Sequence, residues 1–232
     1  MNCPGSVRAE EGYPDETSQY AAEGTAAHHV LLDLALPLGI EPHYFVGKVI
    51  PVEGFKIEVT MEMADHLLFA FDEISEIPGE HYYETRVSLD KWLPGQFGTA
   101  DVGILTDEFV MVRDLKYGQG VPVHPERNEQ MMLYMLGFCA HLNAQGVKIG
   151  DRRLILVVDQ PRCPGGGGPW EFTLEELLEF GREVRAAGEA TYAKKAPRNP
   201  GGKTCQWCKA KAECTALAEH CLNLASLEFD DL

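Results

Sequence analysis

Two strand-like runs separated by only two residues constrain this chain more than any other feature of its sequence. They read FGTADVGILT (residues 97–106) and FVMVRDLK (residues 109–116), and both are rich in the β-branched and aromatic residues typical of strands. A hairpin centred on the two intervening residues pairs the strands symmetrically, so that Asp101 faces Asp114. The Cβ atoms of such a pair are about 4.5–5.5 Å apart, a separation at which two carboxylates repel each other.

Lys116 lies two residues beyond Asp114 and therefore points to the same face of the strand. Two carboxylates and a lysine at one place predict a divalent cation with oxygen ligands, leaving Lys116 to neutralise a phosphate or to orient a water. The alternative is a solvated hairpin in which Lys116 forms a salt bridge with one Asp, and the pair alone favours this alternative. Apolar neighbours favour the cation site, because they raise the free-energy cost of leaving two acids unpaired. These neighbours are Val110, Val112 and Leu115.

Hydrophobic periodicity predicts the other elements and an α/β fold. Helices are predicted at residues 18–38 (ended by Pro37 and Gly39), 58–76, 126–145 and 173–193. Strands are predicted at residues 81–89, 97–105, 109–117 and 154–160, with a hairpin within 43–57 and a flexible surface loop at 165–168. A helix, a three-stranded meander, a second helix and a further strand in this order predict an α/β sandwich with a metal-bound flap.

Composition excludes some classes of protein. The 20 Lys and Arg residues are outnumbered by 36 Asp and Glu residues, and the net charge of -16 excludes a histone-like nucleic-acid coat. The first residues lack the basic and apolar regions of a signal peptide, so none is expected. The longest stretch without Asp, Glu, Lys or Arg, residues 131–147, is too short and too polar to span a membrane. We therefore expect a soluble cytoplasmic protein with no membrane partner.

A basic segment interrupts the acidic chain. Residues 182–211 contain eight Lys or Arg and two Glu, a balance that favours contact with phosphates over a limited surface. A solvated helix and linker explain the same charges equally well. Trp170 and Trp207 are candidates for stacking on bases, although packing within the protein is the default for both.

Four of the seven cysteines fall between residues 205 and 221. The odd number and the absence of a secretion signal argue against a disulfide framework. Cys205, Cys208 and Cys214 have the spacing of soft-metal ligands, and either Cys3 or Cys221 supplies the fourth thiolate. Buried free thiols are disfavoured because the segment is too charged for a core, and the spacing alone favours zinc.

Three further polar residues lie on predicted helices. His28 shares a helix face with Gly24, and such a histidine taken alone is usually a satisfied boundary residue. Gln130 and Tyr134 are four residues apart and therefore lie on one helix face, which is also compatible with an ordinary amphipathic helix.

Four short motifs stand in a fixed order along the chain: GTAAH (24–28), GTAD (98–101), DLK (114–116) and QMMLY (130–134). Their order and spacing resemble the series G-x-x-x-H, G-x-x-D, D-x-K and Q-x-x-x-Y of the RecB-type branch of the PD-(D/E)XK nuclease superfamily. The opening CPGS and the segment AAEGTAAH further resemble a phage-associated group of these nucleases. The resemblance covers almost the whole chain.

The resemblance implies a restriction-endonuclease-like core, a central mixed sheet flanked by helices, at residues 1–196, and a small C-terminal iron–sulfur flap at residues 197–232. The implied ligands of Mg²⁺ or Mn²⁺ are His28, Asp101, Asp114 and the backbone carbonyl of Leu115. Lys116 is implied to be the catalytic lysine beside the two catalytic Asp residues. Gln130 and Tyr134 are implied to order the site and the DNA, and Glu84 is carried over only weakly as an assisting acid.

Iron–sulfur nucleases of this type, such as the CRISPR adaptation nuclease and the AddB nuclease domain, have one Cys before the G-x-x-x-H helix and three at the C-terminus. The resemblance therefore implies a 4Fe–4S cluster held by Cys3, Cys205, Cys208 and Cys214. It implies a metal-dependent DNA exonuclease that acts from DNA ends in phage or prophage recombination in a bacterial host cell. Expected partners are DNA and a phage single-strand annealing protein. The alternative is a non-catalytic or zinc-binding DNA-binding or adaptor module on the same fold.

Overall fold

The computed structural model describes residues 3–15 and 17–230, with the side chains of residues 227–230 excepted. The chain divides into two compact units. Residues 17–181 form the larger unit, and the two ends of the chain, up to residue 16 and from Arg182 onward, form the smaller unit. The division therefore groups Cys3 with the cysteine-rich C-terminal segment.

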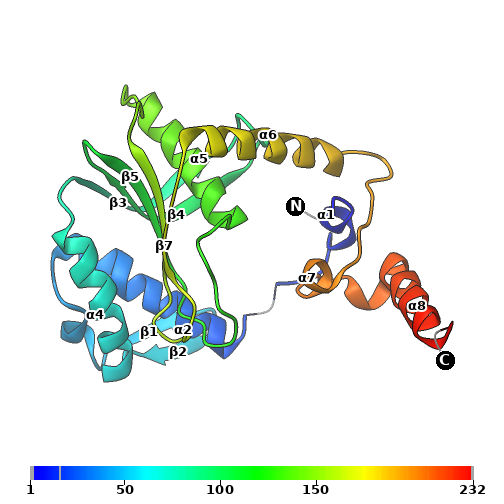
Figure 1. Cartoon of the computed structure of the whole chain (residues 1–232). Coiled ribbons are helices and arrows are strands. Elements are labelled where there is room, and N and C mark those ends of the chain that lie inside the picture. Colours follow the sequence, from blue (N-terminus) through cyan, green and yellow to red (C-terminus); the bar gives the residue numbers. More distant parts are fainter. Residues whose placement is uncertain (1–2, 16, 231–232) are drawn as a thin grey trace. The chain divides into compact units, whose positions relative to one another are not determined.

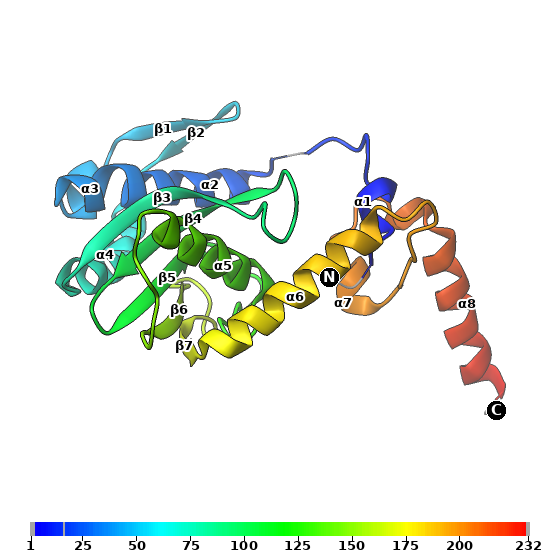
Figure 2. The same cartoon turned by 90° about the horizontal axis from the view of Figure 1, so that it is seen from above.

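A five-stranded mixed sheet is the centre of the larger unit (Figure 2). Its strands, in spatial order, are β3 (Glu80–Ser88), β4 (Phe97–Leu105), β5 (Phe109–Leu115), β6 (Arg153–Asp159) and β7 (Gly168–Phe172). Strands β5 and β6 are parallel, and the other neighbours are antiparallel. A separate hairpin pairs β1 (Val49–Val52) with β2 (Phe55–Glu58). The mixed α/β class predicted from the sequence is confirmed.

The β4–β5 hairpin has the predicted register. Leu105 pairs with Val110, and the ladder continues to Val102 opposite Arg113. The next two residues in this register are Asp101 and Asp114, so the carboxylates lie at the point where the ladder ends.

The fifth strand, β7, was not predicted; residues 165–167 form a loop, as predicted, but Gly168 already belongs to β7. Gly168 pairs with Val158 at the start of β7, and the amide of Gly167 donates to the carbonyl of Val123 at 2.8 Å. Gly167 and Gly168 have φ angles of 82° and 106°, which only glycine adopts readily. Glycine therefore suits both positions of this connection.

Helices cover both faces of the sheet (Figure 1). The helices of the larger unit are α2 (Gln19–His28), the π-helix η1 (His29–Ala35), α3 (Leu36–Leu38), the 3-10 helix η2 (Pro42–Phe45), α4 (Met61–Glu76), α5 (Glu129–Ala144) and the start of α6 (Leu174–Thr191). Gly103 lies against the ring of Phe138, which places α5 on one face. On the other face Ile104 is buried in a core with Leu31 and Leu67, from η1 and α4.

The predicted helix at residues 18–38 is observed as the continuous run α2, η1 and α3. Gly39 ends it with a left-handed φ of 63°, as predicted. Pro37 does not end it, because Pro37 lies within the last turn.

The smaller unit contains α1 (Ser6–Ala9), the end of α6, α7 (Gly202–Cys205), the 3-10 helix η3 (Lys211–Glu213) and α8 (Thr215–Asp230). The Gly5 amide donates to the carbonyl of Pro197 at 2.9 Å, and the Arg8 guanidinium donates to the carbonyls of Tyr192 and Lys194. These contacts join the N-terminal residues to the segment that follows α6.

Within residues 3–15 and 17–230, no helix is both long enough and apolar enough to cross a membrane.

Candidate active site and cysteine cluster

The site begins where strands β4 and β5 stop pairing. Beyond Val102 and Arg113, the backbone amide of Leu115 donates to the Asp101 Oδ2 atom at 2.9 Å instead of to a strand carbonyl. A carboxylate thus takes the place of a backbone acceptor, and the Asp101 side chain is fixed against the strand that carries Asp114.

A backbone distortion at the neighbouring strand accompanies this separation. Before Asp101, Gly98 faces the ring of Tyr134 on α5, whereas after it Val102 lies in the core on the opposite face. In regular alternation residues 98 and 102 would share a face. Glu84, which the β3–β4 register places opposite Asp101, has a left-handed φ of 45°. The alternation of side chains between the two faces of the sheet therefore reverses at Glu84 and Asp101. A left-handed φ at a residue other than glycine, as at Glu84, is strained.

His28 reaches Asp101 from α2. Its Nδ1 donates to the carbonyl of Gly24 at 2.8 Å, and its Nε2 lies 3.1 Å from Asp101 Oδ2. Burial works to lower the pKa of His28, but the hydrogen bond to Asp101 and the charge of Asp101 outweigh it and raise the pKa to about 9. Because Nδ1 holds its proton for Gly24, neutral His28 presents the Nε2 lone pair that a metal requires. A proton and a cation would compete for this atom.

Asp114 is the most deeply buried acid of the site, with 1% of its surface exposed. Burial and then the charge of Asp101 raise its pKa to about 6, although Lys116 acts in the opposite direction. Lys116 Nζ lies 2.7 Å from Asp114 Oδ2, yet this oxygen accepts no well-formed hydrogen bond from any described residue. The alternative to a cation site is a solvated hairpin with a salt bridge between Lys116 and one Asp. The structure contains that salt bridge, but Asp114 is buried, so the end of the hairpin is not solvated.

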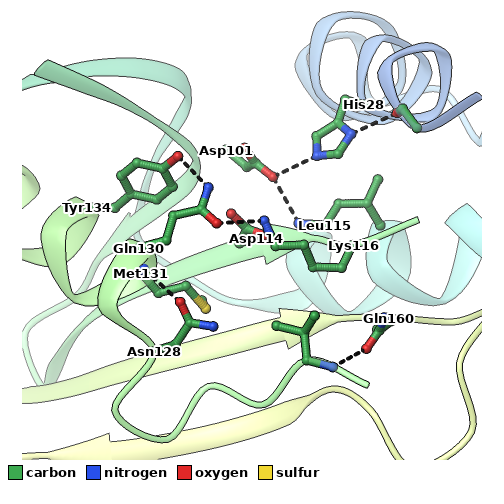
Figure 3. Close-up of polar contacts among 12 residues, drawn as sticks. His28, Asp101, Asp114, Leu115, Lys116, Asn128, Gln130, Met131, Tyr134 and Gln160 are labelled. Atoms are coloured by element: carbon green, nitrogen blue, oxygen red, sulfur yellow. Dashed lines mark hydrogen bonds and ion pairs between the residues drawn. The ribbon is translucent and has the colours of Figure 1, made fainter. Parts of the chain in front are cut away.

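A line of polar contacts continues from Lys116 to α5 (Figure 3). Lys116 Nζ donates to Gln130 Oε1 at 3.1 Å, and Gln130 Nε2 donates to the Tyr134 hydroxyl at 2.7 Å. Gly98 makes the approach of Tyr134 feasible, since a Cβ atom there would lie 2.7 Å from the ring. The four sequence motifs are thereby brought together at one place.

A pocket of about 650 Å³ opens beside these residues. His28, Glu84, Asp101 and Tyr134 line it, together with residues 50–52 of the β1–β2 hairpin. Burial and the charges of Asp101 and Asp33 raise the pKa of Glu84. The pocket is therefore acidic, and a bound cation would lower the repulsion among its carboxylates.

Sequence reasoning missed Gln160, which holds the loop that follows Lys116. Its side-chain nitrogen donates to the carbonyl of Val121 at 2.9 Å. Its side-chain oxygen accepts from the amide of Val123 at 2.8 Å, the contact drawn from Gln160 in Figure 3. A Cβ atom at Gly166 would collide with Gln160 Oε1, so the glycine run is needed for this packing. No sequence signal marked Gln160, because a polar residue at a strand end is usually solvated.

A buried ion pair on β5 was also missed. Arg113 donates to both carboxylate oxygens of Asp159, at 3.0 and 2.6 Å, and to Glu73 at 2.6 Å. The amide of Lys116 donates to the carbonyl of Asp159 at 2.8 Å. This network ties the end of β5 to β6 beside the catalytic candidates. No sequence signal marked Arg113 and Asp159 as a buried pair.

The donor chemistry of the site fits a divalent cation. Asp101 and Asp114 offer carboxylate oxygens, and His28 offers an imidazole nitrogen, the ligands that Mg²⁺ and Mn²⁺ accept. The buried Asp114 Oδ2 atom is the polar atom that such an ion would satisfy. As the described side chains lie, no three His, Cys, Asp or Glu residues are grouped closely enough to ligate a metal, and the Lys116 ammonium lies beside Asp114.

The four predicted cluster ligands line one small pocket of the smaller unit: Cys3, Cys205, Cys208 and Cys214. Two of the sulfurs accept from backbone amides, Cys3 from Asn199 at 3.4 Å and Cys205 from Gly201 at 3.5 Å. Such donors stabilise thiolates that bind metal. Cys221 is exposed on α8 and does not line the pocket. Four thiols are a donor set that suits a soft metal, and Cys3 rather than Cys221 accompanies the other three, but as the described side chains lie the sulfurs are not grouped closely enough to ligate one.

Comparison with known families decides the relationship of the chain. A family described as "Protein of unknown function (DUF2800)" matches residues 1–232. The chain belongs to the DUF2800 family. Among the solved structures that this DUF2800 member matches is "Crystal structure of SSO0001", at 15% identity over 66% of this chain and 68% of that chain, with a TM-score of 0.33. This likeness is too distant to support an argument.

Proposed function

We propose that this DUF2800 protein is a divalent-cation-dependent DNA nuclease whose larger unit is a RecB-type PD-(D/E)XK core. The observation that carries the proposal is the buried Asp114 carboxylate, held next to Asp101 and Lys116 with one oxygen that lacks a well-formed hydrogen bond. Burying a carboxylate beside a second carboxylate is destabilising even when a lysine pairs with it, and burial and the charge of Asp101 raise the pKa of Asp114 despite Lys116. A role in cation binding explains this acid.

The chain supplies distinct groups for phosphodiester hydrolysis. His28, Asp101, Asp114 and the carbonyl of Leu115 would hold Mg²⁺ or Mn²⁺, which when bound would offset negative charge on the phosphate. Lys116 donates to a phosphate oxygen or orients the attacking water once its ammonium is released from Asp114.

Gln130 and Tyr134 hold the Lys116 ammonium in place. The Gln130 amide accepts from Lys116 Nζ with its oxygen and donates to the Tyr134 hydroxyl with its nitrogen, so that α5 fixes the lysine on β5. Catalysis by oriented groups of this kind depends on such support.

Charge distribution favours action at DNA ends. The larger unit, residues 17–181, contains 11 Lys or Arg against 25 Asp or Glu. An acidic unit repels DNA phosphates, so we do not expect it to bind a DNA duplex along its length. Residues 182–211, with eight Lys or Arg and two Glu, provide the local contact with phosphate. We therefore propose an exonuclease that acts from DNA ends. Its proposed role in phage or prophage recombination, in the bacterial cytoplasm alongside a single-strand annealing protein, rests on the resemblance of CPGS and AAEGTAAH to a phage-associated group of nucleases.

We further propose that the cysteine pocket holds a 4Fe–4S cluster on Cys3, Cys205, Cys208 and Cys214. The cluster would join the two ends of the chain, which about 200 residues separate, and closing so long a loop stabilises the folded state. Zinc on the same four thiolates is the alternative. The two differ in colour and iron content, because zinc sites are colourless.

The test uses protein purified without oxygen and DNA labelled at its ends, as linear duplex, linear single strands and covalently closed circles, with Mn²⁺ or EDTA. We expect the linear forms to be degraded only with Mn²⁺ and the circles to persist. Asp114→Asn should abolish the degradation, while the matched control Asp107→Asn at the hairpin turn should not. Rapid cutting of circles would show an endonuclease, and degradation unaffected by Asp114→Asn would remove the proposed site.

A second test addresses the DNA contact. Charge reversal at Lys194, Lys195 and Arg198 should weaken DNA binding and reduce its dependence on salt, because these side chains contact phosphate. Iron content should stay unchanged. Unaltered binding in the charge-reversed variant would contradict the assignment of the basic segment.

A further inference from the structure

Trp207 of the smaller unit is an unusually exposed tryptophan, with 77% of its surface accessible. The other two tryptophans are used in packing. Trp92 is 8% exposed, and Trp170 stacks on Phe172 with ring centroids 4.6 Å apart. A tryptophan ring buries a large apolar area when it is covered, so leaving one exposed forgoes substantial stabilisation. The exposed ring of Trp207 is therefore available to a ligand.

The chain segment that carries Trp207 is basic, although Glu10 and Asp15 from the N-terminal residues contact Lys209. Residues 194–211 contain six Lys or Arg and no Asp or Glu, and all six side chains are exposed. Lys211 Nζ donates to the carbonyl of Gln206 at 3.1 Å, which brings an ammonium group to the backbone next to the ring. Lys209 forms an ion pair with Asp15, whereas Lys203 on α7 forms no ion pair with a described residue. Positive charge around an exposed aromatic ring suits a nucleic acid better than an apolar protein surface.

Short-range contacts fix the backbone that carries the ring. The amide of Cys208 donates to the carbonyl of Cys205 at 3.3 Å, and the amide of Lys209 donates to Glu10 Oε1 at 3.0 Å. Trp207 lies between two cysteines of the small pocket, so its main chain is held on both sides. A ring on a fixed support loses little conformational entropy when it binds.

We propose that Trp207 is a stacking platform for an unpaired base of single-stranded DNA, with Lys203 and Lys211 contacting the adjacent phosphates. Bases inside a duplex have both faces covered, whereas an unpaired base offers a free face to an aromatic ring. Stacking needs no particular base, so the contact is independent of sequence. The proposal rests on the proposed function only for the choice of DNA as the polymer, because neither cation binding nor cleavage is required for stacking.

Binding of an oligothymidylate of about 12 nucleotides, measured by fluorescence anisotropy with EDTA to prevent cleavage, tests the proposal. Trp207→Ala should weaken binding by about 10-fold, the effect of losing one stacked base. Trp207→Phe should retain most of the affinity because a phenyl ring also stacks. The matched control is Phe69→Ala, which removes a 65% exposed aromatic ring from α4 in the larger unit and should leave binding unchanged.

A blunt duplex of equal length separates stacking from other effects. Trp207→Ala should reduce duplex binding much less than oligothymidylate binding, and its visible absorbance and iron content should match the wild type. Equal affinity of Trp207→Ala and wild type for the oligothymidylate would overturn the proposal, as would an equal loss for both DNAs. The binding assay does not involve cleavage, so the two proposals can fail separately. If binding depends on Trp207 but the protein does not cut DNA in the cleavage assay, the nuclease proposal is refuted and the stacking proposal stands.

Discussion

The Oδ2 atom of Asp101 accepts a hydrogen bond from the backbone amide of Leu115 at 2.9 Å, just beyond Val102 and Arg113, where the β4–β5 ladder ends. The same atom lies 3.1 Å from His28 Nε2. One carboxylate oxygen therefore links the end of β5 to α2. The position of Asp101 is set by the backbone, which is what a preorganised cation ligand requires.

Asp114→Asn should stabilise the metal-free protein at neutral pH. Burial, followed by the charge of Asp101, raises the folded-state pKa of Asp114 from 3.8 to about 6, so the folded protein binds this proton more tightly than the unfolded chain. The tighter binding of this proton stabilises the folded wild type below about pH 4, and the stabilisation is lost as the pH rises through about 6. Asn does not titrate, so above pH 6 the free energy of unfolding of the variant should be about 1–3 kcal/mol higher than that of the wild type.

Urea unfolding between pH 4 and 8 in EDTA measures this difference, with the exposed Asp107→Asn as the control. The order should reverse when Mn²⁺ is added, because a cation that binds the folded state stabilises only the wild type. A wild-type protein that is more stable than Asp114→Asn at pH 7 in EDTA would contradict the account of Asp114.

Cys3→Ala and Cys221→Ala should differ in iron content. Cys3 lines the cysteine pocket and accepts from the Asn199 amide, whereas Cys221 is exposed on α8. We expect about four iron and four sulfide per chain in the wild type and in Cys221→Ala, and a bleached protein of lower melting temperature for Cys3→Ala. The reverse pattern would show that Cys221 is the fourth ligand, and zinc in the wild type would show that the centre is not iron–sulfur.

Glu84→Gly should be more stable than Glu84→Ala by about 1 kcal/mol. Both variants remove the carboxylate, but only glycine adopts the left-handed φ of 45° at this position without strain. In a regular strand the preference is opposite, because glycine is the weaker strand former there. Thermal unfolding of the two variants gives the sign directly, and a more stable Glu84→Ala would mean that the backbone at residue 84 is not strained.

The sequence predicted the register of the central hairpin because the two strands are separated by only two residues, which leaves few ways to pair them. It did not predict that the ladder ends at Val102 and Arg113, since that depends on Asp101 competing for the Leu115 amide. The left-handed Glu84 is likewise a product of the assembled sheet. No local preference of Glu would place φ at 45° within a strand.

Strand β7 escaped prediction because its residues, Gly168 to Phe172, include Gly and Pro, which weaken a strand pattern. Next to its pairing with β6, Gly167 and Gln160 both contact the backbone of Val123, a residue far away in the sequence. The motif residues, by contrast, were found from their order along the chain. The structure brings His28, Lys116 and Gln130 within one line of contacts, which periodicity alone does not determine.

The most direct test of the central claim, that Asp101, Asp114 and Lys116 form a cation-dependent cleavage site, is the initial rate of linear DNA degradation in Mn²⁺ by Lys116→Ala. The control is Lys148→Ala, which removes an exposed lysine before β6. We predict that Lys116→Ala cleaves at least about 100-fold more slowly while its Mn²⁺ affinity stays close to that of wild type, and that the control is unchanged. Full cleavage by Lys116→Ala with wild-type Mn²⁺ dependence would contradict the claim.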